Sequence, residues 1–306
     1  MSLSFHAAMG GLDSVTDRLG AVDPRLVLLA LVLHVANHGL RSVAWRNVLA
    51  AAFPERRLSL LPVASAYAAG VALNAVAPAR GGDAAKVGLL RAAIPGSNVA
   101  TIASTMSILV LFDMVMATVL VLLVAAAGLV PIQLPSLAGA WPLLLAGVAV
   151  LAVVGRLVAG RARRRVLALW GRMRQGGAIL RTPRRYLHRV ALVQSGAWVC
   201  RVGVIMCLLA GFGLPASVPT AAVVMILCGA STLIPLTPGG AGTQQVLVAL
   251  AFSQTASAAA VVSFSVAMQA GVTLVNALLG LAGAMAAFRT LRPFAAARGA
   301  LAAARA

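Results

Sequence analysis

The sequence contains few of the side chains that carry catalytic or metal chemistry. Among its 306 residues only 6 are Asp or Glu and 4 are His. Its 3 cysteines lie in apolar segments without a CxxC spacing, which favours small buried side chains over metal or disulfide chemistry. With so few acidic groups, the sequence offers no Ser/His/Asp, Cys/His or paired-carboxylate constellation. We therefore expect a protein that is not an enzyme and that needs no cofactor and no metal.

Charged residues, counted together, are a small fraction of the chain. They make up 10% of the chain, apolar residues make up 61%, and the mean hydropathy is +0.97. Several apolar runs, the longest at 99–130 and 256–288, approach or exceed the roughly 20 residues that cross about 30 Å of hydrocarbon. A soluble fold has no core large enough to hide this apolar surface. The sequence therefore predicts an all-α polytopic membrane protein.

Positive charge is abundant, at a net +19, but it is confined to a few segments. Eleven arginines lie between Arg156 and Arg189 with no acidic residue among them, and from Val190 to Phe288 the only charged residue is Arg201. Basic loops beside uncharged spans follow the positive-inside bias. The pattern favours contact with anionic headgroups of membrane lipids at the cytoplasmic face over binding of nucleic acid. We expect a multi-pass protein of a bacterial-type cytoplasmic (inner) membrane.

Hydropathy divides the chain into a polar lead-in at 1–25, one transmembrane domain at 26–288 and a basic cytoplasmic tail at 289–306. The lead-in could lie on the membrane surface as an interfacial helix. The parts of the transmembrane domain are a first half at 26–155, a basic cytoplasmic loop at 156–189 and a second half at 190–288. The apolar segments expected to be helical are Leu26–Ala44, Leu60–Ala77, Val99–Val130, Leu137–Leu157, Val190–Gly213, Val218–Leu236, Thr243–Phe252 and Ala256–Phe288.

Two of these apolar helices each run into a Pro/Gly-rich break that is followed by a short helix. The first break is at 78–83 and the second at 237–242. Backbone groups freed by such breaks need protein or water as partners, and paired breaks in two halves point to a transport site. The sequence predicts about five full spans plus two re-entrant hairpins in an inverted repeat. The alternative is a pair of ordinary loops at the membrane surface, which would give about 7–8 full spans.

Charge favours hairpins that enter from opposite sides of the membrane, with the N-terminus outside. In that topology the segments 41–59, 78–97, 156–189 and 289–306 are all cytoplasmic, and they hold 22 of the 25 basic residues. Full spans with the N-terminus inside would place the basic segment 41–59 outside, against the positive-inside bias. We therefore expect the first hairpin to enter from the cytoplasm and the second from outside.

The two breaks carry motifs that resemble those of a known family. The first motif reads Asn74-x-x-x-Pro78-x-Arg80-x-Gly82-Asp83-x-x-Lys86, and the second reads Pro235-x-Thr237-Pro238-Gly239-Gly240-x-Gly242-x-x-Gln245. Both are similar to elements of the lysylphosphatidylglycerol synthase transmembrane, or flippase-like, family. The resemblance covers the chain from about Leu12 onward. It implies a lipid-flipping membrane domain, here as a single-domain member without the aminoacyltransferase domain.

The chain departs from the family pattern at several polar positions. Asp83 and Gln245 stand where the family has Glu, and Leu109 and Val110 precede Asp113 where the family often has Glu-Arg. These changes put the identity of the substrate in doubt.

We expect the two breaks to bind the phosphate of a lipid. The short helices begin at about Gly82 and Gly242, and a helix N-terminus attracts anions. Arg80 and Lys86 could hold the phosphate, and Asp83 could cap the helix. The alternative is that the basic residues only anchor the chain at the cytoplasmic surface. The residues expected to bind substrate are Asn74, Arg80, Gly82, Asp83, Lys86, Thr237, Gly239, Gly240, Gly242, Gln244 and Gln245.

Two charged residues, Asp113 and Arg201, lie near the middle of predicted spans. A lone charge there costs at least a few kcal/mol, so we expect the two to form an intramembrane pair. His34 and His38 stand one helical turn apart. Because the sequence identifies no third metal ligand, they favour hydrogen bonding between helices over a metal site.

Two functions from different classes fit these features. The leading one is a transporter or flippase for a phosphate-bearing or polyprenyl-phosphate-linked lipid. The alternative is a non-transporting membrane partner that holds a glycosyl- or aminoacyl-transferase near its lipid substrate.

Overall fold

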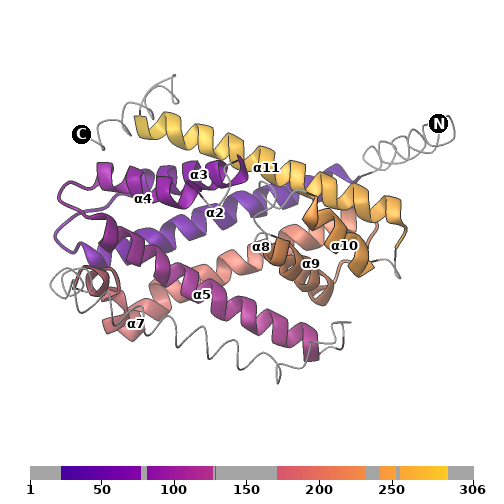
Figure 1. Cartoon of the computed structure of the whole chain (residues 1–306), viewed down its shortest axis with the longest axis horizontal. Coiled ribbons are helices and arrows are strands. Elements are labelled where there is room, and N and C mark those ends of the chain that lie inside the picture. The colour runs from indigo at the N-terminus through magenta and orange to yellow at the C-terminus, as the bar shows by residue number, and fades with distance from the viewer. Residues whose placement is uncertain are drawn as a thin grey trace, which may run out of the picture.

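The computed structural model describes residues 22–76, 81–126, 128, 171–231, 242–252 and 256–288. Every regular element in these residues is helical, which confirms the all-α fold (Figure 1). The elements are α2 (Pro24–Ala52), α3 (Leu60–Val76), α4 (Gly81–Ala93), α5 (Val99–Ala126), η3 (Ala178–Arg181), α7 (Pro183–Tyr186), η4 (Leu187–Ala191), α8 (Leu192–Gly211), α9 (Val218–Ser231), α10 (Thr243–Phe252) and α11 (Ala258–Phe288).

Four helical segments among the described residues are long and apolar enough to cross a membrane. They are Pro24–Ala52, Val99–Ala126, Pro183–Gly211 and Ala260–Ala286. At 1.5 Å per residue each is about 40 Å long, more than the hydrocarbon thickness. Their outer faces are apolar and exposed, as at Val199 (72% exposed), which suits contact with lipid. The expected span at 137–157 and most of the lead-in at 1–25 lie outside the described residues, as does the tail at 289–306.

The remaining apolar helices form two antiparallel hairpins that enter the bundle from opposite ends. In the first, α3 and α4 have 17 and 13 residues; in the second, α9 and α10 have 14 and 10. Figure 1 shows α3 and α4 towards the end where α2 finishes and α5 begins, and α9 and α10 towards the other end. The geometry is that of the two re-entrant hairpins predicted from the sequence. The breaks at 77–80 and 232–241 lie outside the described residues.

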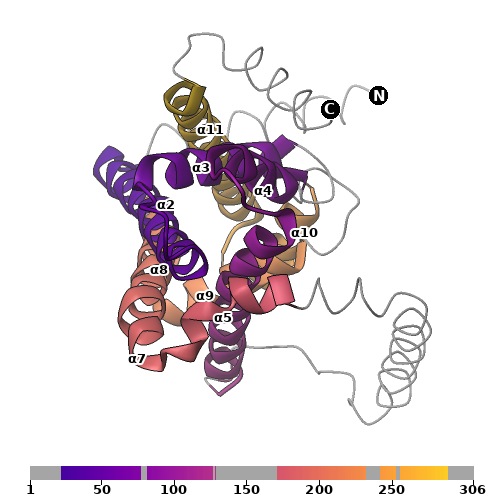
Figure 2. The ribbon, with the colours of Figure 1, turned by 90° about the vertical axis from the view of Figure 1, so that its left-hand side faces the viewer.

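The two halves repeat one design in opposite orientations. A span, a hairpin and a span follow one another as α2, α3–α4 and α5, and again as α8, α9–α10 and α11. Helix α2 packs along α8, while α3 packs along α11. Figure 2, which looks from one end of the bundle, shows α2 beside α8 and α3 beside α11. The inverted repeat expected from the two breaks is therefore present in the fold.

Each half has its own apolar core. One core surrounds Trp45 and Leu49 and is built from α2, α3, α4 and α5, with Ile179 and Val190 added at one end. The other surrounds Phe264 and joins α8, α9, α10 and α11. Small residues let α11 approach α3 closely, because Gly280 faces Ala72 and Gly283 faces Ser65. Such contacts hold helices together where lipid weakens the hydrophobic drive.

Two predicted loop boundaries are wrong because packing extends the helices. Helix α2 continues to Ala52 and so includes Arg41 and Arg46, which the sequence placed in a loop at 41–59. Trp45, Val48 and Leu49 lie on this extension and are fully buried. The basic segment 156–189 is also helical in part, since α7 begins at Pro183 and leads into α8. Proline is well placed there because the first helical position has no bond for its missing N–H.

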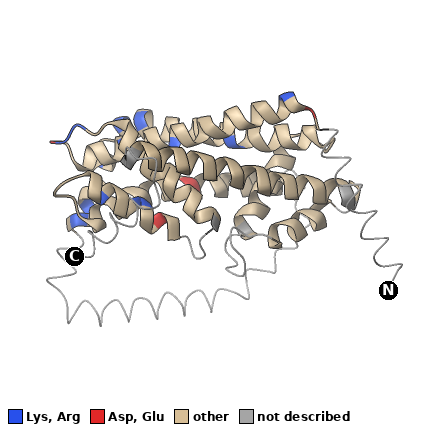
Figure 3. Cartoon of the chain, turned by 90° about the horizontal axis from the view of Figure 1, so that it is seen from above, with Lys and Arg blue, Asp and Glu red and all other residues tan. Residues whose placement is uncertain are grey.

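Basic residues gather at one end of the bundle, where α2 finishes and α5 begins (Figure 3). The basic residues in the turns and helix ends there are Arg46, Arg56, Arg57, Arg91, Arg172, Arg174, Arg181, Arg184, Arg185 and Arg189. Within the part of the chain that the structure describes, one end of the bundle is therefore strongly basic and the other carries little charge.

Candidate functional site

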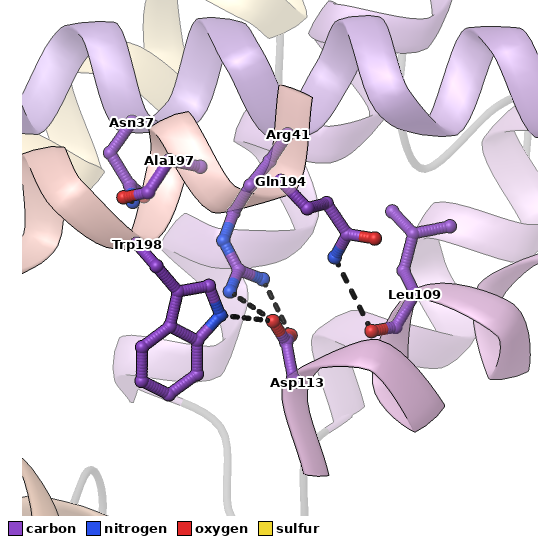
Figure 4. Close-up of polar contacts among 7 residues, drawn as sticks. All are labelled: Asn37, Arg41, Leu109, Asp113, Gln194, Ala197 and Trp198. Carbon is purple, nitrogen blue, oxygen red and sulfur yellow. Dashed lines mark hydrogen bonds and ion pairs between the residues drawn. The ribbon is translucent and has the colours of Figure 1, made fainter. Parts of the chain in front are cut away.

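The centre of the bundle holds an ion pair between α2 and α5. Both guanidinium nitrogens of Arg41 donate to Asp113, with Nη1 2.9 Å from Oδ2 and Nη2 2.7 Å from Oδ1. The indole Nε1 of Trp198 on α8 donates to the same carboxylate at 2.9 Å (Figure 4). Two-point contacts between Arg and a carboxylate are among the strongest polar contacts in proteins. The three side chains tie α2, α5 and α8 together at mid-span.

The prediction that Asp113 pairs with Arg201 is wrong, because Asp113 pairs with Arg41. The guanidinium of Arg201 lies over the ring of Trp198, 5.8 Å from the centroid. The prediction failed because Arg41 was assigned to a loop, which left Arg201 as the nearest intramembrane cation. Arg201 still lies close enough to Arg41 and Asp113 to interact with them electrostatically. The two arginines occupy corresponding places, because each lies past the middle of the first span of its repeat.

Polar side chains around this centre bind backbone carbonyls of neighbouring helices. Asn37 on α2 donates to the Ala197 carbonyl of α8, and Gln194 on α8 donates to the Leu109 carbonyl of α5 at 3.3 Å. Figure 4 shows both side chains beside the ion pair. The acceptor atom of the Gln194 side chain, Oε1, is buried without a hydrogen-bond partner among the described residues. These bonds fix the relative positions of the spans that carry the charges.

The first break is closed by its own side chains. Asn74, on α3, accepts from the Gly82 amide at 2.8 Å and donates to Asp83 at 3.1 Å. Asp83 also accepts from Lys86 Nζ at 2.8 Å. The Gly82 amide, expected to face a phosphate, is thus used to join the two helices of the hairpin. Arg80 lies outside the described residues, so its expected contact with a phosphate stays a prediction.

Gly82 is needed for close packing inside this hairpin. A Cβ at Gly82 would collide with the Gly70 carbonyl oxygen of α3, and a Cβ at Gly70 would collide with the Lys86 side chain. Lys86 is only 7% exposed, and its Nζ lies 4.8 Å from the centre of the Tyr67 ring. A lysine so buried requires a paired charge and an aromatic face to hold it. Lys86 therefore lies inside the hairpin and does not reach a surface as an anchor would.

The helix that follows the second break, α10, is capped by one of its own side chains. Gly242 has a φ of +86°, which glycine adopts without strain, and its amide donates to Gln245 Oε1 at 2.7 Å. This is the reciprocal half of a capping box, so Gln serves where the family motif has Glu. Gln244 beside it is buried. The expected site residues Thr237, Gly239 and Gly240 lie outside the described residues.

The two histidines of α2 meet a polar residue of the last span. Asn276 Oδ1 on α11 lies 2.9 Å from Nε2 of both His34 and His38, and the two Nε2 atoms are 3.1 Å apart. Three or more His, Cys, Asp or Glu side chains that could share a metal ion do not come together anywhere in the described part of the chain. The cluster therefore joins the two repeats by hydrogen bonds between α2 and α11.

A groove of about 1230 Å³ runs between α4 and α5. Its charged residues, Asp83 and Arg91, belong to α4, whereas α5 contributes apolar side chains such as Met106, Leu111 and Met114. Leu111 and Met114 are exposed on the outer face of α5. The groove is thus open to lipid on its outer side. On its inner side it reaches Asp83, which accepts a hydrogen bond from the buried Lys86.

Sequence reasoning missed three residues of the polar centre: Arg41, Tyr67 and Trp198. Arg41 had a usable signal, since no proline occurs between Pro24 and Pro54 to end the helix before it. Tyr67 and Trp198 are aromatic residues in apolar runs, where the sequence does not separate core packing from hydrogen bonding. Their roles depend on which spans are neighbours, which is set by the fold alone.

No curated protein and no solved structure matches the chain. One protein-family model, described as the lysylphosphatidylglycerol synthase TM region, matches residues 3–280. Because this match covers most of the 306 residues and includes both hairpins, the chain belongs to the family of the lysylphosphatidylglycerol synthase transmembrane region.

Proposed function

We propose that this protein moves a phosphate-bearing lipid between the two leaflets of a membrane and performs no chemical reaction on it. The observation that carries the proposal is the groove between α4 and α5, because its composition matches a lipid. One wall presents Asp83 and Arg91, and the other presents Met106, Leu111 and Met114. Membership of a family that is often flippase-like supports the same conclusion.

The groove offers different surroundings to the hydrocarbon chains and to the headgroup of a translocated lipid. Acyl or prenyl chains have no reason to leave hydrocarbon, and the exposed side chains of α5 keep them in contact with it. A headgroup must lose its water to cross, so replacement partners have to line its path. The groove leads to Asp83 and Lys86, and Arg41 and Asp113 lie deeper in the bundle. We infer that the headgroup travels inside while the chains remain in the groove.

The basic end of the bundle faces the cytoplasm in this proposal, and the membrane is a bacterial-type cytoplasmic membrane. The support is the gathering of arginines at the end where α2 finishes and α5 begins (Figure 3), together with the positive-inside bias. The groove then opens towards the inner leaflet, since Arg91 and Val99 lie at its basic end. Anionic lipids of that leaflet are then the lipids whose headgroups lie beside the arginines.

The test is lipid movement in liposomes that contain the purified protein. Phosphatidylglycerol with a fluorophore on one acyl chain is incorporated, and a membrane-impermeant reductant bleaches the outer leaflet. The wild-type protein should make the inner-leaflet lipid accessible as well. Gly88→Trp should slow this exchange, because Gly88 lines the groove and has open space beside its Cα.

Leu122→Trp is the matched control for the groove variant. Leu122 is on the exposed face of α5 and does not line the groove, so exchange should remain at the wild-type rate. Exchange no faster than in protein-free liposomes, with the protein folded and inserted, would refute transport. It would leave the protein as a partner that holds a lipid for a membrane-bound transferase.

A further inference from the structure

The charges inside the bundle do not balance. Lys86 pairs with Asp83 and Arg41 pairs with Asp113. Arg201 is then left with no ion-pair partner among the residues that the structure describes. Its described contact is with the Trp198 ring, and ionisable residues of α2, α3, α5 and α9 lie within electrostatic range of it. Among the described residues, the interior therefore holds three cations and only two anions.

Arg201 points into the protein although it is exposed. Along α8 the buried residues at the i−7, i−4, i+3 and i+4 positions from Arg201 share its face of the helix. They are Gln194, Ala197, Val204 and Ile205. Val199, which faces lipid, lies on the opposite side of α8. Arg201 is nevertheless exposed, so its side chain is accessible to a ligand. Interaction with Tyr67 of α3 and Cys228 of α9 agrees with this position.

An unmatched arginine in such a place is costly without a ligand. Charged residues within membrane spans pair with one another or mark the path of an ion or substrate. The fork of Arg41 is used on Asp113, whereas the fork of Arg201 meets, among the described residues, only the face of an aromatic ring. Its N–H groups thus remain available to an anion with several oxygens, and guanidinium binds phosphate at two points.

We propose that Arg201, held over Trp198 beside the Arg41–Asp113 pair, binds a phosphate anion at the middle of the membrane. The proposal rests on the proposed function, because it makes this phosphate the one in the headgroup of the travelling lipid. The ligand class is a phosphate mono- or diester. Asp113 keeps Arg41 neutralised, so that the site offers one net positive charge and the anion is not held too tightly to leave.

The position of the site agrees with a passage between leaflets. Arg91 lies at the basic end of the groove and Asp83 lies further along α4, whereas Arg201 lies near mid-span on α8. Trp198 donates its N–H to Asp113 and faces Arg201 with its ring, so one residue orients both groups. Trp198 is therefore a positioning residue, and Arg201 is the residue that touches the ligand.

Binding is tested on the full chain in a neutral maltoside detergent, with thermal stability as the readout. A ligand that binds the folded state raises the melting temperature by mass action. The probes are dihexanoyl phosphatidylglycerol, dihexanoylglycerol without phosphate, and inorganic phosphate. Arg201→Gln should weaken binding of the phospholipid by roughly tenfold or more, the size of a lost charged hydrogen bond. Arg201→Lys should retain part of it.

The control is Arg185→Gln, which removes an equal charge from an exposed position on α7 and should bind as the wild type does. If inorganic phosphate also raises the melting temperature, and Arg201→Gln abolishes this rise, the site is supported and accepts free phosphate. If only the phospholipid gives a rise that depends on Arg201, the site is supported and is specific for lipid headgroups. Equal phospholipid affinity in Arg201→Gln and wild type would overturn the site.

Failure of the site and failure of the proposed function give different results. If wild-type protein exchanges lipid in liposomes and Arg201→Gln exchanges it equally fast, the site is refuted and transport stands. If phospholipid binding depends on Arg201 but the wild type exchanges no lipid, the site stands and transport is refuted. Circular dichroism of Arg201→Gln checks its fold, and Arg201→Lys gives the comparison if the Gln variant does not fold.

Discussion

Arg41 and Asp113 face each other across α2 and α5 with both guanidinium–carboxylate contacts at hydrogen-bond distance, 2.9 and 2.7 Å. Neither charge tolerates hydrocarbon alone, so each requires the other. The carboxylate also accepts from Trp198 of the second repeat. Loss of one partner leaves a buried charge and removes a link between the two halves of the bundle.

The first prediction follows from this dependence. Arg41→Gln or Asp113→Asn alone should destabilise the protein by about 3–5 kcal/mol, because one buried charge then lacks its partner. The double variant should lose less than the sum of the two single losses. Melting temperatures of the four proteins in detergent measure the cycle.

The same cycle with Arg201→Gln and Asp113→Asn provides the comparison. Since Arg201 makes no ion pair with Asp113, the coupling should be smaller than that between Arg41 and Asp113. Losses that simply add for Arg41 and Asp113, with strong coupling for Arg201 and Asp113, would contradict the observed pairing.

The second prediction concerns the contact of α3 with α4. Gly82→Ala should destabilise the hairpin by about 1–3 kcal/mol or more, because the new methyl group collides with the Gly70 carbonyl. Gly88→Ala, on the same helix, meets nothing within 4 Å. It should be neutral or stabilising by up to about 1 kcal/mol, because alanine favours helix. Resistance to a protease and the melting temperature measure both variants, and equal behaviour of the two would exclude this packing role.

Most of the fold is readable from the sequence because lipid imposes strong local rules. The start of α4 and both ends of α10 agree with the prediction, since a Pro/Gly break precedes each helix and apolar residues fill it. The hairpins follow from lengths too short for a comfortable crossing. Helix α2 was predicted too short because Arg46 was interpreted as a loop residue, whereas its apolar neighbours are buried in the core.

The site is less readable, because its contacts join residues far apart in the chain. The sequence alone predicts that Asp113 is paired, because an unpaired carboxylate inside a span is energetically costly. Its partner depends on which span lies beside α5, and that is decided by packing of α2 along α8 and of α5 against α2. Asn74 is an element of the family motif, yet its role in holding the Gly82 amide depends on how closely α3 approaches α4.

The third prediction concerns orientation. In a background without the three native cysteines, Ala216→Cys lies in the exposed turn before α9, and Thr182→Cys lies exposed at the basic end. An impermeant thiol reagent should label Ala216→Cys in intact cells and Thr182→Cys only after the membrane is opened, since the basic end faces the cytoplasm. Labelling of Thr182→Cys in intact cells would reverse the orientation.

The last prediction links the histidine cluster to the proposed phosphate site. Asn276 Oδ1 lies 2.9 Å from both His34 and His38, and His34 interacts electrostatically with Arg201. Asn276→Asp places a carboxylate in this positively charged region and offsets the unmatched charge of Arg201. Phosphate affinity should fall by roughly tenfold, the size of one charge interaction in a partly buried site. Asn276→Leu removes the hydrogen bonds without adding charge, so it should lower the melting temperature and leave the affinity for dihexanoyl phosphatidylglycerol near that of the wild type. If Arg201 binds the phosphate through its charge, a carboxylate beside it must weaken that binding. Equal phospholipid affinity in Asn276→Asp and the wild type would therefore show that the charge of Arg201 does not govern binding.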